Sequence, residues 1–300
     1  MKLQFNVMDN EVPRTYECDL NEDESNALIK ARNVLKRIYK HEELYDQVIE
    51  TYLELKTAMY DMSIKSAANA FPIDYVRSHE YRSKLNRLIF NSLNFGKMYL
   101  DEHYKTVNNG KAVKTYVAEV TGNDSNNNEL KKQRAHIYDN NPNYVLACDL
   151  RNYVQHASLP VGSVNSGART VEGDRFSTFY TTIKRDEIKK AKKETLDKFD
   201  DSIDLHEVMD GYITAISEKH IFSREMIIEA MRESLDHIKS IDSEMRKNND
   251  IAGAILVRDE NNNFMFSLGT KWFDIVKHLQ SKHSRPLYLG SYKHHPYKEK

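Results

Sequence analysis

Apolar residues recur at steps of three and four over long stretches of this sequence, and this spacing restricts the fold more than any other feature does. The first stretch contains Leu28, Ala31, Leu35, Ile38, Leu44, Val48, Tyr52, Leu55, Met59 and Met62. Such a period places apolar side chains on one face of an α-helix. The 300 residues include only ten Gly and six Pro, the residues on which tight turns depend. We therefore expect a mainly α-helical protein, in which this stretch forms an antiparallel helical pair or one bent helix.

The same spacing predicts further helices downstream. After Pro72, a second helix carries Tyr81, Leu85, Leu88, Phe95 and Tyr99 on one face. A shorter helix is predicted over roughly residues 144–158, and two others carry the apolar residues of 205–216 and of 227–241. Two helix starts are marked by polar residues, Asn21-x-x-Glu24, which resembles a capping box, and Asp204-x-x-Glu207.

Short β-strands are expected around these helices. The predicted strands are one or two within residues 3–20, one over 176–183, and a hairpin of 251–258 with 264–268, followed by a short helix over 272–280. Residues 105–130 are expected to form short β-like runs and a mobile loop over 122–128, and residues 160–174 read as a loop. This organisation predicts a helical domain over 1–250 with insertions near 105–135 and 160–183, and a region over 251–300 that ends in a basic tail.

Charge and cysteine content exclude several classes of protein. The 44 Lys and Arg residues nearly balance the 45 Asp and Glu residues, which argues against coating nucleic acid through bulk positive charge. Cys18 and Cys148 cannot form a disulfide scaffold, and His278 and His283 do not fit zinc spacing, so we expect no metal and no cofactor. The N-terminus lacks the apolar core of a signal peptide, and no apolar run is long enough to cross a bilayer. We therefore expect a cytoplasmic protein without a membrane partner.

One segment, from Asp149 to Pro160, carries residues suited to chemistry. Because Leu159 precedes a proline, the predicted helix should end near Ser158, which puts His156 in its last turn. The negative end of the helix dipole there favours an imidazolium. Arg151 offers planar donors that suit phosphate oxygens. Asn152 lies four residues before His156, on the same helical face, where it can orient the ring or a substrate oxygen.

An arginine that holds phosphate and a histidine that titrates near neutrality are sufficient for RNA cleavage without metal. The histidine removes the proton of a ribose 2′-hydroxyl or protonates the leaving oxygen, while the arginine stabilises the developing negative charge. Five residues along an ideal helix rotate by roughly 140°, so Arg151 and His156 diverge on one helix. Two copies of the helix paired across a twofold axis would complete one cleft, and we therefore expect a homodimer.

Arg151-Asn152-x-x-x-His156, at the end of a helix in a largely helical chain, resembles the R-x(4–6)-H signature of the HEPN superfamily. Members of that family are helical bundles, frequently dimeric, and many are metal-independent endoribonucleases of toxin–antitoxin or antiphage-defence systems. The resemblance implies a HEPN-like helical bundle with β insertions and a small C-terminal α+β element. It also implies Arg151, Asn152 and His156 as catalytic residues, RNA as substrate, and an antitoxin or defence protein as a possible partner. Ser158 stands where one subgroup carries an adenylylated tyrosine, which puts that mode of control in doubt.

Neighbouring residues extend the candidate site. Ser163, Asn165, Arg169 and Arg175 follow the motif directly and are candidates to line the same cleft as substrate-binding residues. The segment lacks the Lys-Ser/Thr pair of a P-loop, which excludes that motif. The lysine-rich stretch 184–193 is a further candidate for contact with an RNA backbone, although acidic residues interleave with it.

Two other interpretations stay open at this point. Some HEPN members have lost catalysis, so the chain is alternatively a non-catalytic helical interaction or nucleotide-binding module of a defence or regulatory complex. The motif can also occur by chance, on a solvated helix end where His156 caps carbonyl groups and Arg151 pairs with Asp149. The sequence does not define the RNA that is cleaved, the activating trigger or the partner.

Overall fold

The computed structural model describes residues 1–9, 12–68, 74–104, 107–108, 111–112, 114–171, 174–188 and 191–288. At residues 9, 66–68, 107–108, 111–112, 166–171 and 174–178 only the backbone is described, and the basic tail after residue 288 lies outside the described residues. The residues group by their contacts into two compact units: 1–43 with 116–124 and 224–282, here called unit 1, and 44–115 with 125–223 and 283–300, called unit 2. The predicted boundary at residue 250 does not follow this division, because unit 1 contains both sides of it.

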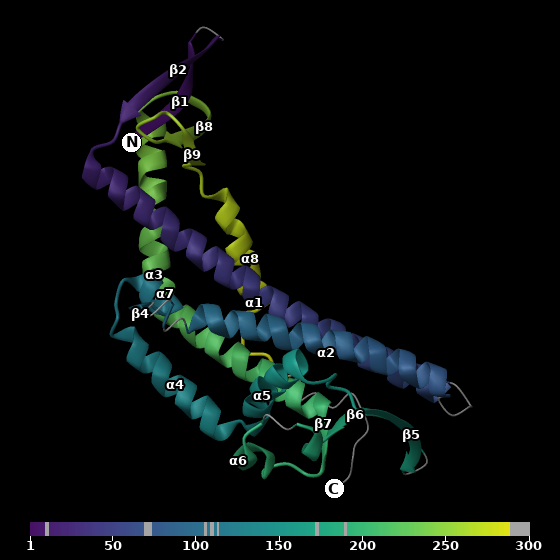
Figure 1. The fold of residues 1–300 in the computed structure, drawn as a ribbon. Coiled ribbons are helices and arrows are strands. Elements are labelled where there is room, and N and C mark those ends of the chain that lie inside the picture. Colours follow the sequence, from purple (N-terminus) through teal and green to yellow (C-terminus); the bar gives the residue numbers. More distant parts are fainter. Residues whose placement is uncertain are drawn as a thin grey trace. The chain divides into compact units, whose positions relative to one another are not determined.

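The described chain is mainly helical, as the apolar spacing predicts (Figure 1). Its helices are α1 (Glu22–Ala68), α2 (Tyr75–His103), α3 (Tyr116–Thr121), α4 (Asn126–Asn140), α5 (Pro142–His156), α6 (Lys193–Leu196), α7 (Leu205–Asn248) and α8 (Asp274–Lys282). Short 3-10 turns, η1 (Arg185–Glu187) and η2 (Lys271–Phe273), precede α6 and α8. No helix in the described part of the chain is both long and apolar enough to cross a membrane.

The two longest helices are each uninterrupted. Of the two forms expected for the first apolar stretch, the chain adopts a single helix of 47 residues. It begins at the predicted capping box, in which the Glu24 amide donates to Asn21 Oδ1 at 2.9 Å and the Asn21 amide donates to Glu24 Oε2 at 2.9 Å. The two helices expected after residue 204 are one helix of 44 residues, α7. Both α1 and α7 contribute residues to both units.

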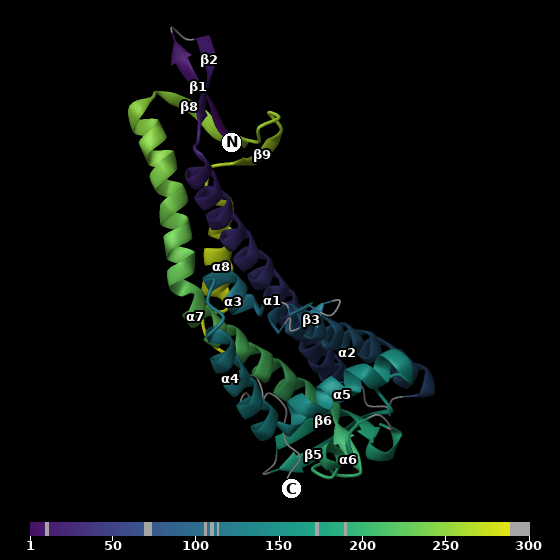
Figure 2. The same ribbon diagram turned by 60° about the vertical axis from the view of Figure 1, so that its left-hand side comes forward.

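Unit 1 contains a four-stranded antiparallel sheet with the order β2-β1-β8-β9. Its strands are β1 (Lys2–Asp9), β2 (Val12–Asp19), β8 (Ile251–Arg258) and β9 (Phe264–Ser267), which confirms the predicted C-terminal hairpin and the strands expected within residues 3–20. Strand β8 pairs with β1, with Lys2 opposite Arg258, so the C-terminal hairpin shares its sheet with the N-terminal one (Figure 2). The N-terminal and C-terminal hairpins therefore form one sheet within unit 1.

Unit 2 has a continuous apolar core built from α1, α2, α5 and α7. Among its fully buried members are Val48, Leu85, Leu93, Leu150 and Ile216. Helix α2 approaches α7 closely at Gly96, where an added Cβ would lie 2.5–2.7 Å from the Tyr212 ring. A glycine is therefore required at this helix crossing because no side chain fits between the helix and the buried ring.

The expectation of a loop over residues 122–128 is wrong in part. Strands β3 (Val107–Asn108) and β4 (Lys111–Ala112) pair as the turn signal predicts, but α3 follows them and α4 begins at Asn126. Asparagine has low helix propensity, which favoured a loop. Burial of Leu130 and Ile137 on α4 outweighs that local preference.

The expectation of a loop over residues 160–174 is also wrong. This segment contains strand β5 (Ser163–Val171), which pairs antiparallel with β6 (Asp174–Lys184) over nine positions, and β6 pairs with β7 (Ser202–Asp204). The small polar residues of β5 have little strand preference of their own. Its backbone groups are satisfied by the adjacent strand β6, which is rich in Thr, Phe and Tyr and was predicted as a strand.

Candidate functional site

Helix α5 carries the motif of Arg151, Asn152 and His156, and an N-cap residue defines where this helix starts. Asn141 occupies the N-cap, where its Oδ1 accepts a hydrogen bond from the Tyr144 amide at 2.9 Å, and Pro142 follows in the first turn. These are the residue types that favour a helix start. Buried side chains such as Leu146, Leu150 and Tyr153 hold one face of the helix in the core of unit 2.

The end of α5 is fixed by contacts with α2. The helix ends at His156, two residues before the predicted end, and the Ala157 amide donates to the Tyr153 carbonyl at 2.8 Å. Gln155 Nε2 donates to Asn94 Oδ1 at 2.8 Å. After the helix, the Val161 amide donates to Asn86 Oδ1 at 2.8 Å in a buried position. The exit of the chain from α5 is therefore anchored at two points on α2.

The three predicted catalytic residues all lie in the second half of α5. Arg151 is half-buried, and its Nη1 donates to Asn152 Oδ1 at 3.3 Å, while its buried Nε has no hydrogen-bond partner among the described residues. His156 is exposed in the last turn. The Asn152 side chain thus accepts from Arg151, and no hydrogen bond joins it to His156 in the described structure. Asp149, the expected partner of Arg151 on a chance helix end, instead accepts from the Lys192 amide at 3.4 Å.

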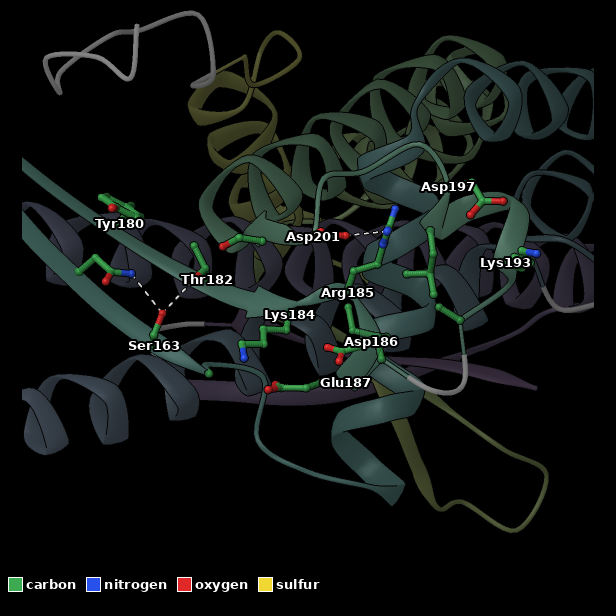
Figure 3. Close-up of a pocket in the computed structure, with 16 residues that line it drawn as sticks. Ser163, Tyr180, Thr182, Lys184, Arg185, Asp186, Glu187, Lys193, Asp197 and Asp201 are labelled. Carbon is green, nitrogen blue, oxygen red and sulfur yellow. Dashed lines mark hydrogen bonds and ion pairs between the residues drawn. The ribbon is translucent and has the colours of Figure 1, made fainter. Parts of the chain in front are cut away.

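Two of the four predicted substrate-binding residues, Ser163 and Asn165, line a pocket of about 1010 Å³ in unit 2 (Figure 3). Ser163 Oγ lies 2.7 Å from Thr182 Oγ1 and accepts from Asn165 Nδ2 at 3.1 Å. The side chains of Arg169 and Arg175 lie outside the described residues. Neither Arg151, Asn152 nor His156 lines this pocket, so the structure separates the motif from Ser163 and Asn165.

The pocket is formed by the sheet β5-β6-β7, η1 and α6, and it carries both signs of charge. Its cationic side chains are Lys184, Arg185 and Lys193, and its carboxylates are Asp186, Glu187, Asp197 and Asp201. Arg185 is already committed, because its Nη2 donates to Asp201 at 2.6 Å and its Nη1 to the Phe199 carbonyl at 3.1 Å. Three residues of the lysine-rich stretch therefore line this pocket, namely Lys184, Arg185 and Lys193.

Helix α5 and the pocket are connected through α6. Asp149 on α5 accepts from the backbone amide of Lys192, the residue that precedes α6, and partial burial raises the pKa of Asp149 against the opposing effect of Lys192. Lys193, the next residue, lines the pocket. The motif helix therefore contacts one wall of the pocket without contributing Arg151 or His156 to its lining.

A cluster of four buried or half-buried polar residues in unit 2 was not found from the sequence. Lys56 on α1 donates to both carboxylate oxygens of Asp210 on α7 at 2.9 and 3.1 Å, and its Nζ also contacts His206 Nε2. Tyr52 donates to the same carboxylate. Burial lowers the pKa of Lys56 against the opposing effect of Asp210, and burial together with Asp210 raises the pKa of Tyr52.

The sequence did contain a signal for this cluster. Tyr52 and Lys56 are four residues apart within the apolar stripe of α1, and His206 and Asp210 are four apart at the start of α7. A charged residue inside an apolar stripe indicates a buried partner. Lys56 Nζ makes three contacts with His206 and Asp210, which account for its three N–H donors, so this lysine joins α1 to α7.

Lys219 is a second buried lysine that the sequence did not reveal. Its side chain is fully buried and its Nζ has no hydrogen-bond partner among the described residues. The ammonium lies 4.8 Å from the ring centroid of Tyr144 and 5.4 Å from that of Tyr104, which are cation–π distances. Burial lowers the pKa of Lys219 from 10.5 to about 8.

We expect Lys219→Met to stabilise the protein at pH 7. The unfolded lysine titrates near 10.5 and the folded one near 8, so at pH 7 both are charged and the full cost of burying the charge is present. That difference corresponds to about 3 kcal/mol at about 1.4 kcal/mol per pKa unit. Above pH 8 the folded lysine loses its proton first, so the cost falls and the advantage of methionine shrinks to about 1 kcal/mol near pH 9.5.

Urea unfolding of the Lys219→Met variant and the wild type at pH 7 and pH 9.5 measures this difference. Lys131→Met, at an exposed position on α4, is the matched control and should change the free energy of unfolding by less than about 0.5 kcal/mol. A Lys219→Met variant that is no more stable than the control at pH 7 would contradict the assignment of Lys219 as a destabilising buried charge.

Among the described residues, no group of three or more His, Cys, Asp or Glu side chains is placed to hold a metal ion. Fold and site together define a class of mainly α-helical protein with small antiparallel sheets and a polar pocket on one of them. Comparison of the chain with protein-family models, with curated proteins and with solved structures finds no match.

Proposed function

We propose that this chain is a cytoplasmic, metal-independent endoribonuclease with a HEPN-like helical bundle, acting as a toxin or as an effector of antiphage defence. The observation that carries the proposal is the second half of α5. There an exposed His156 occupies the last helical turn, and Arg151 is joined to Asn152 at 3.3 Å earlier on the same helix. The resemblance of these three residues to the HEPN signature supplies the reaction class.

The proposed reaction needs one phosphate-binding group and one proton-transfer group. The 2′-oxygen of the substrate ribose forms a bond to phosphorus while the bond from phosphorus to the 5′-oxygen breaks, which leaves a 2′,3′-cyclic phosphate and a 5′-hydroxyl. His156 takes the proton from the 2′-hydroxyl or gives one to the departing 5′-oxygen. Arg151 donates to the phosphoryl oxygens as negative charge develops, and Asn152 holds the guanidinium in place.

The separation of Arg151 from His156 along α5 supports a shared cleft in a homodimer. The two residues diverge by roughly 140° about an ideal helix axis. In a twofold pair, the arginine of one copy and the histidine of the other serve the same phosphate. An antitoxin or defence partner that covers the end of α5 would hold such an enzyme inactive.

Incubation of the purified protein with total RNA tests the proposal. We expect cleavage products that persist in excess EDTA, because no step uses a metal ion. An oligonucleotide with one 2′-deoxyribose should be spared on the 3′ side of that sugar alone, because the attacking hydroxyl is missing. Absence of cleavage of every RNA tested would sink the nuclease assignment and favour the non-catalytic interaction or nucleotide-binding module.

A further inference from the structure

The pocket on the sheet β5-β6-β7 carries five charged side chains that have no side-chain partner among the residues that the structure describes. They are Lys184, Lys193, Asp186, Glu187 and Asp197. None of these five side chains forms a hydrogen bond or an ion pair with another residue in the described ranges, whereas Arg185 and Asp201 satisfy each other. Figure 3 shows Lys193 and Asp197 on one side of the pocket, Ser163, Thr182 and Tyr180 on the other, and Lys184 and Glu187 between them.

This mixture of charges restricts the chemical classes of ligand that the pocket can bind. Three carboxylates repel a polyphosphate, and they do not converge as a metal site among the described residues. A neutral sugar would leave both lysines unpaired. A ligand with one phosphate and several N–H or O–H donors satisfies both sets, because lysines bind phosphate oxygens and carboxylates only accept hydrogen bonds.

The remaining lining fits a flat ring. Ile188 is buried at the pocket, and Ala191 and Leu196 beside it are half-buried, which gives an apolar surface. Tyr180 adds a half-buried aromatic ring on which a base can stack. At Gly162 an added Cβ would lie 3.2 Å from the Thr182 carbonyl oxygen and 3.5 Å from Glu187 Oε2, so the absence of a side chain there keeps this part of the pocket open.

We propose that this pocket binds a guanine ribonucleotide, with its phosphate at Lys193 on one side of the pocket and its base read by the carboxylate of Glu187. Guanine is the base whose Watson–Crick edge presents two adjacent donors, N1–H and the 2-amino group, and one carboxylate accepts both. Adenine and cytosine present one donor beside an acceptor, which a carboxylate repels. Ser163 and Thr182 supply hydroxyls for the ribose. The proposal deepens the proposed function, on which it rests for RNA as a source of the nucleotide.

Isothermal titration with nucleoside monophosphates tests the base preference. The His156→Ala variant is used so that binding is measured without cleavage, and the probes are GMP, AMP, CMP, UMP and inorganic phosphate. We expect GMP to bind roughly 5- to 150-fold more tightly than AMP, the range that one well-placed bidentate pair provides. Equal affinity for all four nucleotides, or inorganic phosphate binding as tightly as GMP, would overturn the proposal.

Two neighbouring lysines provide a matched pair of variants. Lys193→Ala removes a pocket cation and should weaken GMP binding about tenfold, the loss expected for one charge-assisted hydrogen bond. Lys192→Ala removes an equally exposed lysine whose Nζ donates to the Tyr138 hydroxyl outside the pocket, and should leave binding unchanged. Glu187→Gln keeps the side-chain shape and should abolish the preference for GMP over AMP. Asp197→Asn, on the side of the pocket where Lys193 lies, should keep that preference. Identical binding by Lys193→Ala and Lys192→Ala contradicts the site.

A single-stranded oligouridine with one central guanosine distinguishes free nucleotide from RNA as the source. Binding of this RNA that exceeds that of GMP, and that Lys193→Ala weakens, identifies the pocket as a guanosine subsite for RNA. Binding of GMP alone identifies a free-nucleotide site. If the protein cleaves RNA but does not distinguish GMP from AMP, only the proposed guanine site is wrong. If it prefers GMP but cleaves no RNA, only the nuclease activity is wrong.

Discussion

Replacing His156 by alanine is expected to slow RNA cleavage by roughly 10²–10⁴-fold, the usual contribution of one general acid or base. The side chain is exposed and takes no part in the core, so the variant should fold as the wild type does. The rate is measured on a short RNA under single-turnover conditions, and folding is checked by thermal unfolding. His278→Ala, at an exposed histidine on α8, is the control and should retain the wild-type rate. A His156→Ala protein that cleaves at the wild-type rate removes His156 from the mechanism.

Mixing two inactive variants tests whether the cleft is shared. If the arginine of one copy and the histidine of the other form each cleft, a heterodimer of Arg151→Ala with His156→Ala contains one intact pair. Remixing the two proteins should then restore up to about a quarter of the wild-type activity, since half of the dimers are mixed and each has one working cleft of two. If no activity returns although mixed dimers form, both residues act within one copy.

Replacing Glu42 by alanine is expected to destabilise the protein by about 3–5 kcal/mol. Glu42 is fully buried in unit 1, where Arg224 Nε and Nη2 donate to its two carboxylate oxygens at 2.8 and 2.6 Å. Gln280 Nε2 also donates to this carboxylate, at 3.2 Å. Removal of the carboxylate takes away both charge-assisted hydrogen bonds that the largely buried guanidinium of Arg224 makes with Glu42. Thermal unfolding should show a fall in melting temperature on the order of 10 °C.

A second glutamate provides the control for this effect. Glu229 on the same helix as Arg224 pairs with Arg232 at 2.8 Å, but both side chains are exposed, so Glu229→Ala should cost less than about 1 kcal/mol. Replacing both buried partners, Glu42→Leu with Arg224→Met, should recover much of the loss because no charge is left buried alone. A Glu42→Ala protein as stable as Glu229→Ala would show that the buried pair contributes nothing.

Local signals in the sequence were sufficient for the long helices and for most strands, but not for α3, α4 and α6. The period of the apolar residues predicts α1, α2, α5 and α7. The capping box of Asn21 and Glu24, whose two hydrogen bonds are present in the structure, marks the start of α1. The strands within residues 3–20 follow from alternation, and the hairpin β8–β9 follows from alternation and the polar turn between its strands. Such features depend on residues less than about ten positions apart, so they can be recognised without a structure. Strand β5 was missed because its small polar residues carry little preference, and its pairing with β6 supplies the order.

Burial of charged side chains could not be predicted in this way. Glu42 lies in the polar run Lys40-His41-Glu42-Glu43, which looks like a solvated face, yet its partner is 182 residues away. Lys56 is different in that its place in the apolar stripe of α1 indicates burial, but its partner Asp210 is 154 positions away and the stripe does not identify it. Each of these contacts forms only after two helices have packed, and the sequence around either residue gives no measure of that packing.

For the candidate site, the sequence by itself determined the helical class, the position of α5, and the placement of Arg151, Asn152 and His156 in its second half, because caps and apolar spacing act within a few helical turns. The tertiary structure decided which of these residues share a surface. It assigned Ser163 and Asn165 to a pocket with residues 180–202 and kept that pocket apart from the motif. The physical reason is that a pocket is made by the pairing of β5, β6 and β7 and the docking of α6, contacts between segments whose proximity depends on the folded chain as a whole.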